Sequence, residues 1–176
     1  GGYVARELYN RTGAQIYGID SSEEAICISQ KKSEEIPIIY KKENITKLSF
    51  KDNFADVILC VGVIEHIKDY ENCLNEIKRV LKNNGYVYVV SSNRNSFIYQ
   101  QKIIREKLGL WNYGYQKNWT KDALEKMFLV HNFTTLYIDV DKGIGNFKIV
   151  DKMDRFLSST TRRRGRYIYY VGRLTK

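Results

Sequence analysis

The chain has 176 residues, of which 43% are hydrophobic and 28% are charged, a composition typical of one folded globular domain. No apolar run approaches the ~20 residues that a membrane-spanning helix needs, so we expect no membrane span. The net charge of +9 would suit an anionic partner such as a nucleic acid, but the lysines are spread along the whole chain and favour an ordinary basic surface.

The cysteines argue against a disulfide framework or a metal site. Cys27, Cys60 and Cys73 form no C-x-x-C pair, and the first two stand in apolar patterns where a thiol acts as a small hydrophobic side chain. We therefore expect reduced thiols, no metal and a cytoplasmic protein.

The first part of the chain alternates helix and strand patterns. Helical spacing of apolar residues predicts a helix over 2–11, and an apolar run over 14–19 predicts a strand that ends at Asp20. Ser21 or Ser22 can cap a following helix whose first turn carries acids, and 36–40 reads as a further strand.

The second part continues the alternation and contains one unusual stretch. The patterns predict strands over 54–61, 86–91, 133–140 and 167–174, and helices over 70–81, 121–130 and within 147–157. Residues 93–119 are polar and aromatic, and they read as an insertion with a helix over 96–108. This order predicts a doubly wound, mainly parallel α/β sheet with an antiparallel C-terminal edge strand, in a single domain over 1–176.

Asp20 is the first candidate functional residue. In open α/β sheets, ligands gather at the carboxyl ends of the strands, and a carboxylate there can accept both hydrogen bonds of a nucleoside ribose diol. It would stand 19 residues after Gly1-Gly2, close to the spacing expected between a glycine-rich turn and such an acid. The alternative is that Asp20 only caps the next helix.

Three stretches together resemble the class I, seven-stranded, Rossmann-like S-adenosylmethionine-dependent methyltransferases, in their small-molecule, type-11-like branch. Phe54-Ala-Asp-Val-Ile-Leu-Cys-Val-Gly-Val-Ile-Glu-His66 is similar to the family's fourth strand and its Glu-His turn. Residues 17–22 resemble the second strand, and 81–89 the fifth. The resemblance implies a methyltransferase with S-adenosylmethionine as cofactor.

The resemblance also implies which residues bind the cofactor. It assigns Asp20 to the ribose, Asn44 and Ile45 to the adenine, and the end of the fourth strand to the methionine part; the full set is Gly1, Gly2, Asp20, Ser21, Asn44, Ile45, Cys60, Val61 and Gly62. The family's acidic residue and Gly-x-Gly-x-Gly loop are absent, and Gly1-Gly2 stands where the last glycine would fall. We therefore expect an N-terminally truncated chain that lacks the first strand and binds the cofactor weakly or not at all.

Methyl transfer from a sulfonium needs mainly alignment of the two substrates, and a base only for a hydroxyl or a protonated amine. His66 is the candidate catalytic base because imidazole titrates near neutral pH; the alternative is that it only contacts the cofactor or orders its turn. The insertion over 93–119 lies where relatives carry a lid over the acceptor, which nominates Asn93, Tyr99, Tyr113 and Tyr115 as contacts of a small-molecule acceptor.

Two other functions stay open on the sequence. A nicotinamide-dependent oxidoreductase or epimerase would also use an acid after the second strand, although no convincing Tyr-x-x-x-Lys pair is present. A non-catalytic, nucleic-acid-binding member of the family would suit the basic charge. Methylation of DNA amino groups is disfavoured, because the Asn-Pro-Pro-Tyr type of motif cannot occur in a chain whose one proline is Pro37.

Overall fold

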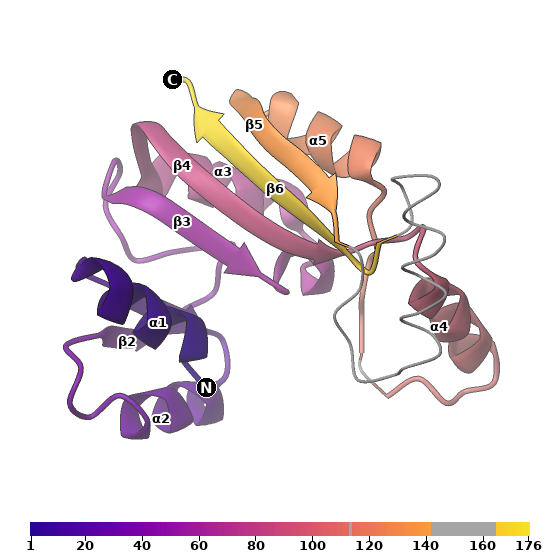
Figure 1. Cartoon of the computed structure of the whole chain (residues 1–176), viewed down its shortest axis with the longest axis horizontal. Coiled ribbons are helices and arrows are strands. Elements are labelled where there is room, and N and C mark those ends of the chain that lie inside the picture. Colours follow the sequence, from indigo (N-terminus) through magenta and orange to yellow (C-terminus); the bar gives the residue numbers. More distant parts are fainter. Residues whose placement is uncertain (113, 142–164) are drawn as a thin grey trace. The chain divides into compact units, whose positions relative to one another are not determined.

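The computed structural model describes residues 1–112, 114–141 and 165–176 of the chain (Figure 1). They form two compact units, Gly1–Ser49 and Phe50–Lys176, and each is described by itself below. The predicted helix within 147–157 and the predicted substrate contact Tyr113 lie outside the described residues.

The first unit is a pair of parallel strands with two helices. Its elements are α1 (Tyr3–Thr12), β1 (Tyr17–Asp20), α2 (Glu23–Lys31) and β2 (Ile39–Lys42). Strands β1 and β2 pair with Asp20 opposite Lys42, so both leave the sheet at the same edge. The strands begin later than the sequence predicted, and Ser22 rather than Ser21 caps α2 by accepting the Ala25 N–H at 3.2 Å.

Two glycines let the ring of Tyr40 pack closely in this unit. A Cβ on Gly18, its partner in β1, would lie 2.5 Å from two ring carbons of Tyr40. Gly2 has a φ of 67°, and a Cβ there would lie 2.5 Å from the Tyr40 hydroxyl. Gly2 therefore needs both the left-handed conformation and the missing side chain.

The second unit is built on a mixed sheet of four strands. Its elements are β3 (Ala55–Val61), the 3₁₀ turn η1 (Ile64–His66), α3 (Tyr70–Val80), β4 (Leu81–Ser92), α4 (Phe97–Lys107), α5 (Lys121–Leu129), β5 (Phe133–Val140) and β6 (Tyr167–Leu174). The strand order is β3-β4-β6-β5, with β3 parallel to β4 and β6 antiparallel to both of its neighbours. The α/β class and the antiparallel last strand are confirmed.

The position of the last strand corrects the sequence prediction in one respect. Strand β6 does not form the edge but lies between β4 and β5, with hydrogen bonds to both. Ile168, Tyr170 and Leu174 on β6 are fully buried. A strand inside the sheet has a neighbour on each side, so β6 buries more apolar surface there than it would at the edge.

Helices α3 and α5 cover one face of this sheet (Figure 1). Phe128 of α5 stacks on Tyr170 with ring centroids 4.4 Å apart and meets Phe133 edge to face at 5.4 Å. Leu74 and Ile77 of α3 are fully buried on the same side. Cys60 of β3 and Val87 and Val89 of β4 are also buried, and the candidate site is built at the carboxyl ends of these two strands.

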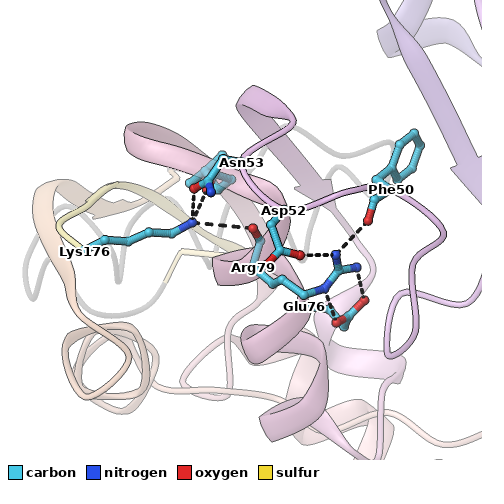
Figure 2. A network of polar contacts seen from close by, with 7 residues as sticks. Phe50, Asp52, Asn53, Glu76, Arg79 and Lys176 are labelled. Atoms are coloured by element: carbon cyan, nitrogen blue, oxygen red, sulfur yellow. Dashed lines mark hydrogen bonds and ion pairs between the residues drawn. The ribbon is translucent and has the colours of Figure 1, made fainter.

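A polar network joins the loop before β3 to the end of α3 and to the C-terminal residue (Figure 2). The guanidinium of Arg79, near the end of α3, donates to both carboxylate oxygens of Glu76 at 2.7 and 2.8 Å and to Asp52 at 2.8 Å. It also donates to the backbone carbonyl of Phe50 at 2.7 Å, and Lys176 donates to the side chain of Asn53. These bonds fix the loop that leads into β3.

Candidate functional site

In the first unit, Asp20 lies at the carboxyl end of β1 and is solvent-exposed. One carboxylate oxygen, Oδ1, accepts the Ser22 N–H at 2.9 Å, which orients the side chain without making it the helix cap. The other oxygen, Oδ2, has no partner in the part of the chain that the structure describes. Asp20 therefore has a fixed orientation and an acceptor oxygen open to a ligand.

Asn44 and Ile45 follow β2 at the same edge of the two-stranded sheet. The Glu43 N–H donates to the Asp20 carbonyl at 3.0 Å, which ties the two loops together. The side-chain oxygen of Asn44 accepts the Thr46 N–H at 3.0 Å and the Thr46 hydroxyl at 2.9 Å. Asn44 is exposed and Ile45 is half-buried, so the amide N–H₂ of Asn44 is the group that remains available as a donor.

The other predicted cofactor residues of this unit lie on its helix ends. Gly1 is exposed and its carbonyl accepts from Arg6 at 2.8 Å, while Gly2 precedes the first turn of α1. Ser21 is exposed between Asp20 and the cap Ser22. The first unit thus carries Gly1, Gly2, Asp20, Ser21, Asn44 and Ile45 among its described residues.

In the second unit, the end of β3 carries Cys60, Val61 and Gly62. Cys60 is buried against the covered face, and burial, followed by the nearby Cys73, raises the pKa of its thiol. Only the backbone of Cys60 therefore reaches the strand end. Val61 is exposed, and Gly62 turns the chain with a φ of 66°, where a Cβ would meet no atom within 4 Å.

Glu65 ties the following turn to the end of β4. Its side chain is 2% exposed, and it accepts hydrogen bonds from the Ser91 hydroxyl at 3.2 Å, the Ser92 hydroxyl at 3.1 Å and the Ser92 N–H at 3.3 Å. The Glu65 backbone carbonyl accepts the Lys117 N–H at 2.7 Å. Sequence analysis identified Glu65 only as part of the Glu-His turn, and these hydrogen bonds to the end of β4 were not predicted.

His66 is exposed at the end of η1, and its Nδ1 lies 3.0 Å from the backbone oxygen of Tyr115. A carbonyl oxygen can only accept, so Nδ1 carries the hydrogen, and Nε2 of the neutral imidazole is the unprotonated nitrogen. The contact thus selects the tautomer that leaves Nε2 able to accept a proton.

The segment Tyr115–Trp119 contacts Glu65 and His66 of η1 through its backbone. Several side-chain hydrogen bonds also fix its position. The side chain of Gln116 donates to the Ser92 hydroxyl at 3.1 Å. Lys102 of α4 is 5% exposed and donates to the Gln116 carbonyl at 2.5 Å and to Asn118 at 3.2 Å. Lys102 and Gln116 were not predicted, because no local sequence signal marks a lysine that folds inward.

The predicted acceptor contacts differ in their surroundings. Asn93 is fully buried, with its amide nitrogen donating to the Gly165 carbonyl at 2.6 Å and its amide oxygen accepting the Asn95 N–H at 3.0 Å. Tyr99 is half-buried on α4, and Tyr115 is exposed. The structure therefore brings the Tyr115 carbonyl to His66, whereas the side chain of Asn93 is buried and bonded to Gly165 and Asn95.

Within residues 1–112, 114–141 and 165–176, no helix is both long and apolar enough to cross a membrane. The same residues contain no group of three or more His, Cys, Asp or Glu side chains that could hold a metal ion.

Comparison with known proteins identifies the class of this arrangement. An uncharacterized protein of Methanocaldococcus jannaschii is 48% identical over 58 residues, which are 33% of this chain and 25% of that protein. The ubiquinone biosynthesis O-methyltransferase of Pelagibacter ubique is 31% identical over 106 residues, 59% of this chain and 44% of that enzyme. The chain therefore spans less than half the length of these two relatives.

Solved structures share the fold. A putative methyltransferase of Bacillus halodurans superposes with a TM-score of 0.77 over 100% of this chain and 89% of its own, at 16% sequence identity. Identity this low shows the fold alone, which is the Rossmann-like methyltransferase fold.

A methyltransferase domain family matches residues 1–89, which contain both the first unit and the strand and turn that end at His66. This match places the chain among the methyltransferases rather than among the nicotinamide-dependent oxidoreductases, an alternative that the sequence left open. The chain belongs to the methyltransferase domain family, whose cofactor is S-adenosylmethionine.

Proposed function

We propose that the protein transfers the methyl group of S-adenosylmethionine to a hydroxyl group of a small molecule. The observation that carries the proposal is the contact of 3.0 Å between Nδ1 of His66 and the Tyr115 carbonyl within the matched family, which makes Nδ1 the donor and leaves Nε2 of the neutral ring as the acceptor. The name of the Pelagibacter ubique relative, an O-methyltransferase, supports oxygen as the acceptor atom.

The residues of the first unit fit the nucleoside part of the cofactor. Oδ2 of Asp20 would accept from the ribose diol while Oδ1 stays bound to Ser22. The Asn44 N–H₂ would donate to a ring nitrogen of the adenine, since its oxygen already accepts two bonds from Thr46. Ile45 would pack on the base, and Gly1, Gly2 and Ser21 would offer backbone and hydroxyl groups nearby.

The end of β3 would receive the methionine part through the backbone of Cys60, Val61 and Gly62. When bound, S-adenosylmethionine supplies a methyl group already activated by its sulfonium. His66 would accept the proton of the acceptor hydroxyl at Nε2, and its bond to Tyr115 would hold the ring in place while the charge develops. The main work of the chain is alignment.

We place the acceptor against the insertion over 93–119, with Asn93, Tyr99, Tyr113 and Tyr115 as candidate contacts. We treat 1–176 as one methyltransferase-like domain. The unpaired thiols Cys27, Cys60 and Cys73 favour a reducing compartment, which supports a cytoplasmic location.

Calorimetry with S-adenosylhomocysteine tests the cofactor residues. Asp20→Asn keeps an oxygen for the Ser22 N–H but replaces the second acceptor with a donor, so binding should weaken by about 10-fold to 100-fold. Glu24→Ala, which removes an exposed acid one turn further on, is the matched control and should leave binding unchanged. Equal affinity of Asp20→Asn and the parent protein, or tighter binding of NAD, would contradict the assignment.

The base is tested by transfer of labelled methyl groups to a panel of small phenols, alcohols and amines. His66→Asn retains an N–H for the Tyr115 carbonyl but has no basic nitrogen. We expect S-adenosylhomocysteine binding to persist and transfer to hydroxyl acceptors to fall by about 100-fold to 10,000-fold. An unchanged rate in His66→Asn would remove His66 from the chemistry.

A further inference from the structure

Two lysine side chains make cation–π contacts with aromatic rings next to the His66 turn. We call these residues the lysine–aromatic cluster: Lys68, Tyr70, Tyr115, Lys117 and Trp119. The cluster belongs to the same unit as His66 and is joined to its turn by backbone groups. The Tyr115 carbonyl accepts a hydrogen bond from Nδ1 of His66, and the Lys117 N–H donates to the carbonyl of Glu65, the residue before His66.

The rings position the two ammonium groups. Nζ of Lys117 lies 4.2 Å from the ring centroid of Tyr70 and 4.1 Å from that of Trp119. The two rings meet edge to face with centroids 5.1 Å apart, so they form two walls around the ammonium. Nζ of Lys68 lies 5.6 Å from the ring centroid of Tyr115. A ring face attracts a cation but does not neutralise it.

Neither Lys68 nor Lys117 forms an ion pair among the described residues, and three carboxylates close to Lys68 in the sequence have other partners. Glu65 accepts from two serines. Asp69 caps α3 by accepting from the N–H and the side chain of Asn72. Glu71 lies 3.0 Å from His131. The ammonium groups thus retain N–H donors for a ligand.

We propose that the lysine–aromatic cluster binds an anionic group, a carboxylate or a phosphate, on the molecule that is methylated. This inference rests on the proposed function in that the bound molecule is the methyl acceptor. Two point charges, each with N–H donors, suit an anion of either shape, and the exposed ring of Tyr115 suits an apolar body beside it. The substrate class becomes a small organic acid with a hydroxyl group that reaches Nε2 of His66.

Nuclear magnetic resonance titration with matched probes tests the proposal without any cofactor. Benzoate and phenyl phosphate carry the anion in two forms, and benzamide has the shape of benzoate without its charge. We expect the two anions to shift the signals of His66, Tyr115 and Lys117, and to bind at least about fivefold more tightly than benzamide. Tighter binding of phenyl phosphate than of benzoate would identify the anion as a phosphate, and the reverse as a carboxylate.

Variants connect the binding to the two lysines. Lys68→Gln and Lys117→Gln should each weaken benzoate binding by about fivefold, and Lys117→Arg should restore it because it returns the charge to the rings. Lys82→Gln removes a lysine that is paired with Asp56 at 2.8 Å, and should have no effect. Should Lys117→Gln fail to fold, Lys68→Gln and Lys117→Arg still decide the question.

The proposal is overturned if benzoate and benzamide bind equally, if the shifts lie away from His66 and Tyr115, or if Lys82→Gln weakens binding as much as the cluster variants. If the parent protein binds benzoate through the cluster but transfers no methyl group to any acceptor, the proposed function is rejected and the anion site stands. The two failures can therefore be told apart.

Discussion

Replacement of Glu65 by alanine should destabilise the second unit by about 3 kcal/mol, because the carboxylate is the acceptor of three hydrogen bonds in a buried place. The Ser91 hydroxyl is fully buried and would lose its partner without access to water. An unsatisfied buried donor costs about 1–3 kcal/mol, and the two donors of the half-buried Ser92 would lose less because water can reach them.

Glu65→Gln is the informative comparison. Its amide oxygen can still accept from Ser92, and its amide nitrogen can donate to the Ser91 hydroxyl, which can also act as an acceptor. We expect a loss of only about 1 kcal/mol, since the bonds lose their charge assistance but the buried Ser91 hydroxyl keeps one hydrogen bond, now as an acceptor. Asp122→Ala removes an exposed acid of the same unit and serves as the control, with a change of less than about 1 kcal/mol.

Urea denaturation followed by tryptophan fluorescence measures the three free energies of unfolding. The reasoning is refuted if Glu65→Ala loses less than about 1 kcal/mol, or if Glu65→Gln is as damaging as Glu65→Ala. The second result would mean that the charge itself, rather than the set of acceptors, stabilises the turn.

Three further predictions test other parts of the structure. With a thiol reagent near neutral pH, the native protein should react only at the exposed Cys27, because Cys60 and Cys73 are buried; unfolding in urea should expose all three. Phe128→Ala should cost about 3–5 kcal/mol, whereas Leu129→Ala, at a half-exposed position, should cost less than about 1 kcal/mol. Burial, followed by nearby Asp141, raises the pKa of Tyr169 from 10.0 to about 12, so the neutral phenol is favoured in the folded state. Its contribution to stability should be full below about pH 10, fall towards about pH 12, and vanish in Tyr169→Phe, as measured by unfolding free energy against pH.

Local patterns in the sequence were enough to find the regular elements. Strands β5 and β6 begin and end where alternating apolar residues predicted, and α3 ends one residue before its predicted limit. These elements pack one face on a single core, so their periodicity reports burial directly. The strands β1 and β2 were placed less accurately, because they are short and half-exposed and the apolar run extends beyond the paired residues.

The sequence by itself determined the α/β class, the membership of a methyltransferase family and the choice of His66 as a candidate base, because each follows from residues that are close together in the chain. Only the tertiary structure decided which nitrogen of His66 carries the hydrogen, since that depends on a carbonyl 49 residues away at Tyr115. It also decided that Lys117 stands between two rings and that β6 lies inside the sheet. Contacts between distant residues are set by how the elements pack, and no local period records them.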